Sequence, residues 1–259
     1  MSRKYLFTNG DSWTWGQGLQ EDQPDHKPRG QWPDVVGEEL NLDVINISEC
    51  GSSNERICRT TIEWVCGNLD KIKDTLFIIG WTVSDRWEWW DNFENDWTKC
   101  YAHHGGDTLT YRMDKKWWTE FYTRFFDIRN GTYKSILQIV MLQSFLKQYN
   151  CKYLFFQGFG THLFNKKNIQ GDIEVPADGY MTKVGSEHTP HDLKVFKSLL
   201  NQFDFNNIIT KDEYDSMDNF LRYKYGEDSY NEAMEKVHGH PNRESHRVWG
   251  LEICKLVQD

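Results

Sequence analysis

The sequence lacks the long apolar segments that membranes and secretion require. No stretch of the chain approaches the run of about 20 apolar residues that spans a bilayer. The first residues, Met1 to Phe7, also hold no apolar core of signal-peptide length. We therefore expect no membrane partner and a cytoplasmic location, where cysteines such as Cys50, Cys58 and Cys66 stay reduced.

Basic clusters and metal-ligand spacings are missing too. The chain carries 30 Lys and Arg against 39 Asp and Glu, a net charge of -9, and no basic block stands out, so nucleic acid is not the expected partner. None of the six cysteines forms a CxxC pair. Two local groups offer metal ligands, His103–His104 with Asp107 and His188 with His191–Asp192, but no further ligand is spaced to complete either site. A polar loop is the simpler interpretation of both groups, and we expect no metal.

Two common catalytic and cofactor motifs are absent as well. The chain has no Gly-x-Ser-x-Gly elbow, which argues against the α/β-hydrolase fold. Gly16-Gln-Gly18 and Gly158-Phe-Gly160 lack the third glycine of a dinucleotide-binding loop. The sequence therefore gives no support for a dinucleotide cofactor.

What the sequence does hold is an alternation of short apolar runs with helical patterns. The apolar runs predict strands at 5–8, 44–47, 76–79, 153–156 and 208–209. The helical patterns predict helices at 32–40, 54–65, 133–149, 193–200 and 243–257. Such alternation predicts a parallel sheet covered by helices on both faces, with the active site beyond the carboxyl ends of the strands.

Two segments fall outside this alternation. Residues 81–128 hold seven of the twelve tryptophans, and residues 158–190 are rich in Gly, Asp and Thr. Both are longer than ordinary connections, and we interpret them as insertions over the site of a single domain, residues 1–259. The tryptophans either form a hydrophobic cluster that caps the sheet or display rings that stack on sugars. Candidate substrate-binding rings are those of Trp81, Trp87 and Trp89.

Two short motifs at opposite ends of the chain point to nucleophilic catalysis. Ser12 follows the first predicted strand in the run Asn9-Gly-Asp-Ser12, which places its hydroxyl at the top of the sheet. A serine hydroxyl needs an adjacent base to act as a nucleophile, and Gly239-His-Pro-Asn242, just before the last predicted helix, offers His240. Taken singly, Asp11-Ser12 is equally typical of a helix cap, and His240 of a surface histidine. The two motifs together are more specific and favour a Ser12–His240 pair.

With these motifs the sequence resembles the SGNH hydrolases, also called the GDSL family. The family's first, second, third and fifth blocks are similar to Phe7–Ser12, Asn46–Asn54, Ile78–Thr82 and His238–Asn242. The resemblance implies an α/β fold, a three-layer α/β/α sandwich with a mostly parallel, flavodoxin-like sheet, and neither a metal nor an organic cofactor. It further implies Ser12 as nucleophile, His240 as base, and an oxyanion hole that includes the backbone N–H groups of Ser12 and Gly51.

Two positions depart from the family pattern. Two residues after the third-block glycine the family has Asn, where this chain has Thr82. Either the Thr82 hydroxyl or the Asn54 amide would then complete the oxyanion hole. The family also has an Asp two or three residues before the catalytic histidine, where this chain has His238 and Val237. The orienting role falls to His238, to Glu235 as the nearest upstream acid, or to neither, leaving a dyad.

The activity that the resemblance implies is hydrolysis of an acyl ester, acetyl esters included, on a carbohydrate or another small molecule. The alternative, which the two departures favour, is an SGNH-fold carbohydrate-binding protein with weakened or lost catalysis. Gly80-Trp-Thr82 followed by Arg86 is similar to a variant among phage-encoded members. For such a member, association with the virion is the alternative to the cytoplasm. No pattern in the sequence predicts an oligomeric state.

Overall fold

The centre of the protein is a four-stranded parallel sheet in the order β2-β1-β3-β6. The computed structural model describes residues 3–19, 28–92, 95–101, 120–121, 124, 128–159, 164, 197–211, 213–234 and 239–258. The strands of the sheet are β1 (Tyr5–Asn9), β2 (Asp43–Asn46), β3 (Thr75–Trp81) and β6 (Lys152–Gln157). The strand predicted at 208–209 is reduced to a single parallel bridge between Phe155 and Ile208.

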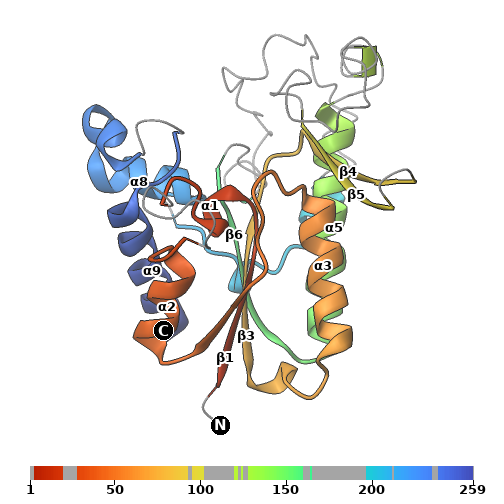
Figure 1. The fold of residues 1–259 in the computed structure, drawn as a ribbon, viewed down its shortest axis with the longest axis horizontal. Coiled ribbons are helices and arrows are strands. Elements are labelled where there is room, and N and C mark those ends of the chain that lie inside the picture. Colours follow the sequence, from red (N-terminus) through yellow and green to blue (C-terminus); the bar gives the residue numbers. More distant parts are fainter. Residues whose placement is uncertain are drawn as a thin grey trace.

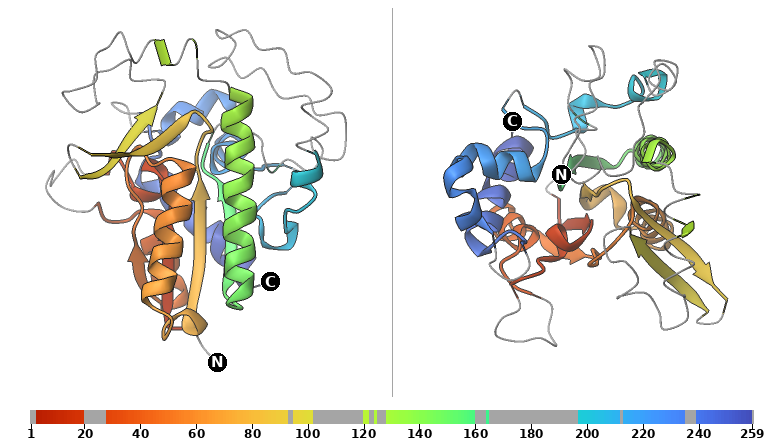
Figure 2. Two further views of the ribbon diagram at one scale, coloured as in Figure 1. Left: turned by 90° about the vertical axis from the view of Figure 1, so that its right-hand side faces the viewer. Right: turned by 90° about the horizontal axis from the view of Figure 1, so that it is seen from above.

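Helices cover both faces of this sheet (Figures 1 and 2). On one side lie α2 (Trp32–Leu40), α8 (Met217–Tyr225) and α9 (Arg243–Gln258), and on the other lie α3 (Asn54–Gly67) and α5 (Ile128–Gln148). Because both faces are covered, apolar residues fill whole strands. All seven residues of β3 are buried. The predicted α/β class, with three layers and a parallel sheet, is confirmed.

Consecutive residues of each strand pack into different layers, because side chains of a strand alternate between its two faces. On β1, Phe7 belongs to the hydrophobic cluster that includes Ile57 of α3 and Ile139 of α5. Its neighbour Leu6 belongs to the second cluster, with Val36 of α2 and Ile253 of α9. The two clusters hold the strands in register, so the residues that follow each strand meet at the same edge.

The other described elements are short. α1 (Ser12–Trp15) follows β1, and the 3-10 turn η1 (Ile72–Asp74) precedes β3. Two more 3-10 turns, η4 (Phe205–Asn207) and η5 (Glu227–Ala233), lie between β6 and α9 in the chain. The helix predicted at 193–200 is described only from residue 197, where it is helical to residue 200.

The 81–128 segment contains an antiparallel hairpin of β4 (Arg86–Asp91) and β5 (Asp96–Tyr101). An ion pair anchors it to α3. Nε and Nη2 of Arg59 each lie 2.9 Å from a carboxylate oxygen of Glu88, whose side chain is 2% exposed. The same guanidinium lies 4.2 Å from the centre of the Trp97 ring. A bidentate pair with a buried carboxylate fixes both the position and the orientation of the hairpin relative to α3.

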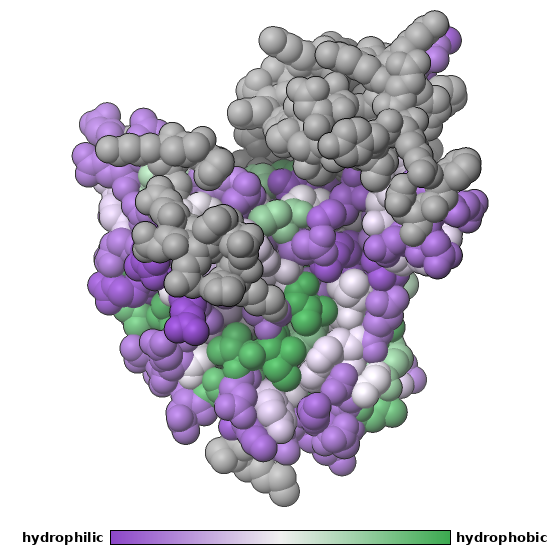
Figure 3. Space-filling model, in the orientation of Figure 1, coloured by the Kyte–Doolittle hydropathy of each residue, from purple (hydrophilic) through white to green (hydrophobic). Residues whose placement is uncertain are grey.

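The edge strand β2 is only partly covered. The side chains of Val44 and Ile45 on this strand are half-buried. Figure 3 shows apolar side chains gathered between the two helical layers on this face of the molecule. In the described parts of the chain, no helix has the length and apolar character that a membrane crossing requires.

Candidate active site

The end of β1 is tied to α3 and cannot shift independently of it. Nδ2 of Asn9 donates to the hydroxyls of Thr60 (2.9 Å) and Thr61 (3.0 Å) on α3. At the next position a Cβ atom would lie 2.3 Å from Oγ1 of Thr14, so only glycine fits at residue 10. The turn that carries Ser12 is therefore held by α3 at its start and packed closely against Thr14 of α1 and the backbone of Gly80 in β3.

Asp11 and Ser12 have different tasks. Oδ1 of Asp11 accepts from the N–H of Trp13 at 3.0 Å and so caps α1. Ser12 is the first residue of α1, and its side chain takes no part in the cap. The helix-cap interpretation thus holds for Asp11, and it leaves the Ser12 hydroxyl available for another partner.

That partner is His240, 228 positions away in the chain. Oγ of Ser12 lies 2.9 Å from Nε2 of His240, within the range that proton transfer requires. Ser12 is 3% exposed and His240 is half-buried. In the tautomer of His240 whose Nε2 carries no proton, the hydroxyl donates to this nitrogen, which is the arrangement that makes serine a nucleophile.

The start of α9 holds His240 in place. Oδ1 of Asn242 accepts from the N–H of Ser245 at 2.9 Å, which caps the helix. An antiparallel bridge pairs Pro241 with Met234. The Gly-His-Pro-Asn motif is therefore a helix start that presents its histidine toward the end of β1.

Two backbone donors lie in the turns that follow β1 and β2. Among the described residues, neither the N–H of Ser12 nor that of Gly51 donates to a protein acceptor. Gly51 has a φ of +73°, in the left-handed region that favours glycine. The oxyanion roles expected for these two N–H groups remain predictions.

Thr82 and Asn54 have structural roles instead of the predicted oxyanion roles. Oγ1 of Thr82 donates to Oδ2 of Asp11 at 2.6 Å. Nδ2 of Asn54 donates to the Thr82 carbonyl (3.1 Å) and to Ser135 Oγ (2.9 Å), while its Oδ1 accepts from the Thr82 N–H (2.9 Å). These donors are already engaged inside the protein. The prediction that either side chain completes the oxyanion hole is corrected on this ground.

Arg86, at the start of β4, joins the turn of Ser12 to the turn of Gly51. Its Nη1 lies 3.0 Å from Oδ2 of Asp11 and 3.4 Å from the carbonyl oxygen of Ser52. The Asp11 carboxylate is 2% exposed and therefore needs such a partner. The sequence marked Arg86 only as part of a motif variant, because its partners lie 34 and 75 positions away.

A second cation, Lys99 of β5, reaches the turn of Gly51 from the other strand of the hairpin. Its Nζ donates to the Cys50 carbonyl at 3.0 Å and pairs with the Glu49 carboxylate. Arg56 also pairs with Glu49, at 2.6 Å. Burial alone would raise the pKa of Glu49, but the hydrogen bonds and charges of Lys99 and Arg56 lower it below its usual value. Glu49 is therefore a stable anion that anchors both cations.

Cys50 is the other nucleophilic side chain in this turn. Burial, assisted by the negative charge of Asp11, raises the pKa of the Cys50 thiol to about 12. A thiol is reactive as its thiolate, so at neutral pH Cys50 is an inert neighbour of the site.

His246, in the first turns of α9, is a buried core residue. Its Nδ1 accepts from the N–H of Trp32 at 3.3 Å. Burial, and then the charges of His240 and Arg243, lower the pKa of His246 to about 3. His246 is therefore neutral in the folded protein and is no second base.

The lowered pKa of His246 predicts a loss of stability in acid. The unfolded chain binds this proton near pH ~6.5, whereas the folded protein binds it only near pH 3. Between these values the free energy of unfolding should fall as pH falls, by up to about 1.4 kcal/mol per pH unit from this residue. Denaturant unfolding of the wild type and of His246→Gln at several pH values tests this, with a shallower slope expected for the variant. Parallel slopes would contradict it.

The candidate orienting residues lie outside the described part of the chain. Glu235 and His238 both belong to residues 235–238. An orienting role for either one remains a prediction. The two groups interpreted as polar loops also lie outside the described part of the chain, and that interpretation remains a prediction. They are His103–His104 with Asp107, and His188 with His191–Asp192.

The candidate sugar-binding tryptophans fall into two groups. Trp81 is fully buried in the core and packs edge-on against Phe155, with ring centres 5.4 Å apart, so it offers no ring to a ligand. This corrects its predicted substrate-binding role. Trp87 and Trp89 on β4 are half-buried. Two further rings, those of Trp90 and Trp97, are 46% and 38% exposed and face each other across the hairpin.

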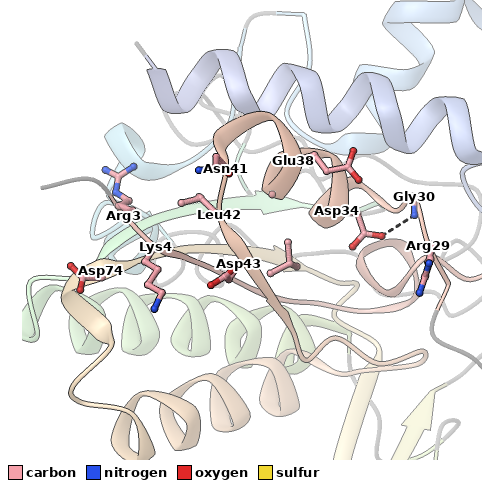
Figure 4. Close-up of a pocket in the computed structure, with 12 residues that line it drawn as sticks. Arg3, Lys4, Arg29, Gly30, Asp34, Glu38, Asn41, Leu42, Asp43 and Asp74 are labelled. Atoms are coloured by element: carbon pink, nitrogen blue, oxygen red, sulfur yellow. Dashed lines mark hydrogen bonds between the residues drawn. The ribbon is translucent and has the colours of Figure 1, made fainter.

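Neither a metal site nor a second reactive centre is evident in the described ranges. No group of three or more His, Cys, Asp or Glu among the described residues could hold a metal ion. A hollow of about 890 Å³ runs along α2 and the start of β2 (Figure 4), and the residues that line it include Lys4, Asp34 and Asp43. Its charged lining mixes both signs and includes neither Ser12 nor His240.

Fold and site together define a three-layer α/β/α protein with a serine–histidine pair at the carboxyl edge of its sheet. The chain belongs to the family of unknown function DUF6071, whose model matches residues 16–172. No curated protein matches the chain.

Several solved structures are similar in fold. One is a member of the lipolytic protein G-D-S-L family from Veillonella parvula, 14% identical, with a TM-score of 0.46 and coverage of 98% of each chain. A second is a psychrotrophic esterase from a Pseudoalteromonas species, 11% identical, with a TM-score of 0.46 and coverage of 98% of this chain and 97% of the other. A third is a lipase/acylhydrolase from Enterococcus faecalis, 10% identical, with a TM-score of 0.47 and coverage of 98% of this chain and 95% of the other.

Proposed function

We propose that this protein is an SGNH-type serine esterase that uses Ser12 as nucleophile and His240 as base. The observation that carries the proposal is the 2.9 Å contact between Ser12 Oγ and His240 Nε2. It is supported by two available backbone donors, the N–H groups of Ser12 and Gly51. A nucleophile, a base and oxyanion donors are the parts that acyl transfer requires.

The reaction follows from this geometry. Oγ of Ser12 forms a bond to the acyl carbon of the ester while its proton passes to Nε2 of His240. The charge that develops on the acyl oxygen is met by the N–H groups of Ser12 and Gly51. His240 then gives the proton to the departing alcohol, and the ester C–O bond breaks. Water, deprotonated by His240, attacks the acyl-enzyme, which releases the acid and restores Ser12.

The substrate class that we propose is an acyl ester, acetyl esters included, carried on a carbohydrate. Its support is the tryptophan-rich hairpin, which follows β3 directly and therefore starts at the site's edge. Trp87 and Trp89 remain the proposed sugar-facing rings. Glu235 and His238 remain the proposed orienting residues for His240.

One observation favours a second candidate, a carbohydrate-binding protein with little turnover. The side-chain donors of Thr82 and Asn54 are both engaged in structural hydrogen bonds. The loss of one oxyanion donor costs roughly 10²–10³ in rate. A protein with two backbone donors and no third donor can bind its ligand and still hydrolyse it slowly.

Hydrolysis of matched esters by the full chain separates these candidates. The measurement is kcat/KM for p-nitrophenyl acetate and for an acetylated xylose disaccharide. Turnover of both, with the larger value for the sugar ester, is the result we expect. Turnover of p-nitrophenyl acetate alone would keep the esterase and overturn the carbohydrate substrate. If neither ester is cleaved but the disaccharide changes the tryptophan fluorescence, the binding protein is correct.

A further inference from the structure

The turn from Glu49 to Ser52 holds Gly51 between two carbonyl groups that are each bound by a cation from the β4–β5 hairpin. Lys99 Nζ lies 3.0 Å from the carbonyl oxygen of Cys50, before Gly51. Arg86 Nη1 lies 3.4 Å from the carbonyl oxygen of Ser52, after Gly51. The hairpin therefore contacts the peptide group that Cys50 shares with Gly51 and, beyond the glycine, the peptide group that Ser52 shares with Ser53.

The contact with Lys99 bears directly on the Gly51 N–H. The Cys50 carbonyl and the Gly51 N–H belong to one planar trans peptide group and point in opposite directions. Fixing the oxygen of that group therefore fixes the direction of its N–H. A cation on the carbonyl also draws electron density from the peptide and makes its N–H a stronger donor.

This peptide needs an external restraint. Glycine has more backbone freedom than any other residue, and Gly51 adopts a φ of +73°. The ammonium of Lys99 is itself held by the Glu49 carboxylate, which also binds Arg56 of α3. The Cys50–Gly51 peptide is thus connected to helix α3 by a chain of contacts through Lys99, Glu49 and Arg56.

We infer that Lys99 is a positioning residue that aims and polarises the Gly51 N–H at the developing oxyanion. The inference rests on the proposed function, in which Gly51 is an oxyanion donor. It assigns a role to the inserted hairpin that does not depend on sugar binding. It also explains how the site works with Thr82 in place of an amide side chain, because the restraint strengthens one of the two backbone donors that remain.

Substitution of Lys99 in the full chain tests the inference. Lys99→Met should lower kcat roughly 10-fold to 100-fold, less than the 10²–10³ that removal of a whole oxyanion donor costs. KM should stay within a few-fold, because the interaction strengthens in the transition state. Lys99→Arg, which keeps a cationic donor, should restore most of kcat. Lys99 is 31% exposed on its side chain, so the fold should survive.

Lys147→Met is the matched control. Lys147 also pairs with a carboxylate, that of Asp204 at 2.6 Å, but it lies in the last turn of α5, away from the Gly51 turn. Loss of this ion pair should leave kcat unchanged. If Lys99→Met and Lys147→Met have the same kcat, or if Lys99→Arg is as slow as Lys99→Met, the positioning role is wrong.

A readout without substrate keeps the inference separate from the proposed function. In protein labelled with ¹⁵N at its 19 glycines, the amide signal of Gly51 is identified as the one lost in Gly51→Ala. Lys99→Met should shift this signal and speed its hydrogen exchange, while Lys147→Met should not. If the wild type cleaves no ester, the proposed function fails, and the Gly51 signal still decides whether Lys99 controls this peptide. An unmoved Gly51 signal in Lys99→Met would overturn the inference.

Discussion

Replacement of Ser12 by alanine is expected to abolish ester hydrolysis, with a fall in kcat on the order of 10⁶-fold, the loss measured when a serine protease loses its nucleophile. The physical reason is that no other reactive nucleophile stands in the described site. Cys50 is a neighbour, but its thiol has a pKa raised to about 12 by burial. The measurement is the rate of p-nitrophenyl acetate hydrolysis at saturating substrate.

The fold of the Ser12→Ala variant should survive, because the change removes one hydrogen bond, which contributes about 1 kcal/mol to stability. Ser144→Ala is the matched control. Its hydroxyl also makes one hydrogen bond, to the Val140 carbonyl at 2.8 Å, but on the exposed side of α5. The control should keep full activity. A folded Ser12→Ala protein that retains turnover would remove Ser12 from the mechanism.

Replacement of His240 by alanine should lower kcat by roughly 10⁴–10⁶, because Ser12 loses the one group that, among the described residues, is placed to take its proton. The 2.9 Å distance between Ser12 Oγ and His240 Nε2 means that the serine depends on this imidazole directly, with no group between them. Imidazole added to the buffer should restore part of the rate, since a free base can enter the space that the side chain leaves. The measurement is kcat with and without imidazole for His240→Ala.

The same additive should not restore activity to Ser12→Ala, which lacks the nucleophile. A His240→Ala rate that is close to the wild-type rate would show that another group is the base. His246 is the nearby alternative in sequence, but its pKa is lowered to about 3 by burial, so it binds no proton near neutral pH. The two variants together therefore distinguish a Ser–His pair from a general effect on the fold.

The sequence predicts the parts of this protein that depend on local pattern. Buried runs such as Leu76 to Ile79 predict strands, because an apolar segment covered on both sides needs no polar alternation. The turn motifs at Ser12 and His240 can also be recognised in the sequence, because each lies next to a strand or helix that the local pattern predicts. Their proximity follows from topology, because a first strand at the centre of a parallel sheet exits at the edge where loops from later elements meet.

The parts that could not be predicted depend on long-range contacts. Thr82 donates to a carboxylate 71 positions earlier, and Lys99 reaches a carbonyl 49 positions earlier. Neither contact has a sequence spacing that marks it. Trp81 was misplaced because the last residue of a strand can point into the core or out of it, and only the packing against Phe155 decides which.

Labelling with a fluorophosphonate tests the central claim most directly, because the reagent bonds to a serine only where a base and an oxyanion site activate it. The full chain is treated with the reagent, digested, and examined by mass spectrometry. We expect one phosphonyl group on the peptide that contains Ser12, with none in Ser12→Ala and much slower labelling in His240→Ala. A correctly folded wild-type protein that stays unlabelled, or that is labelled on a residue other than Ser12, would contradict the account.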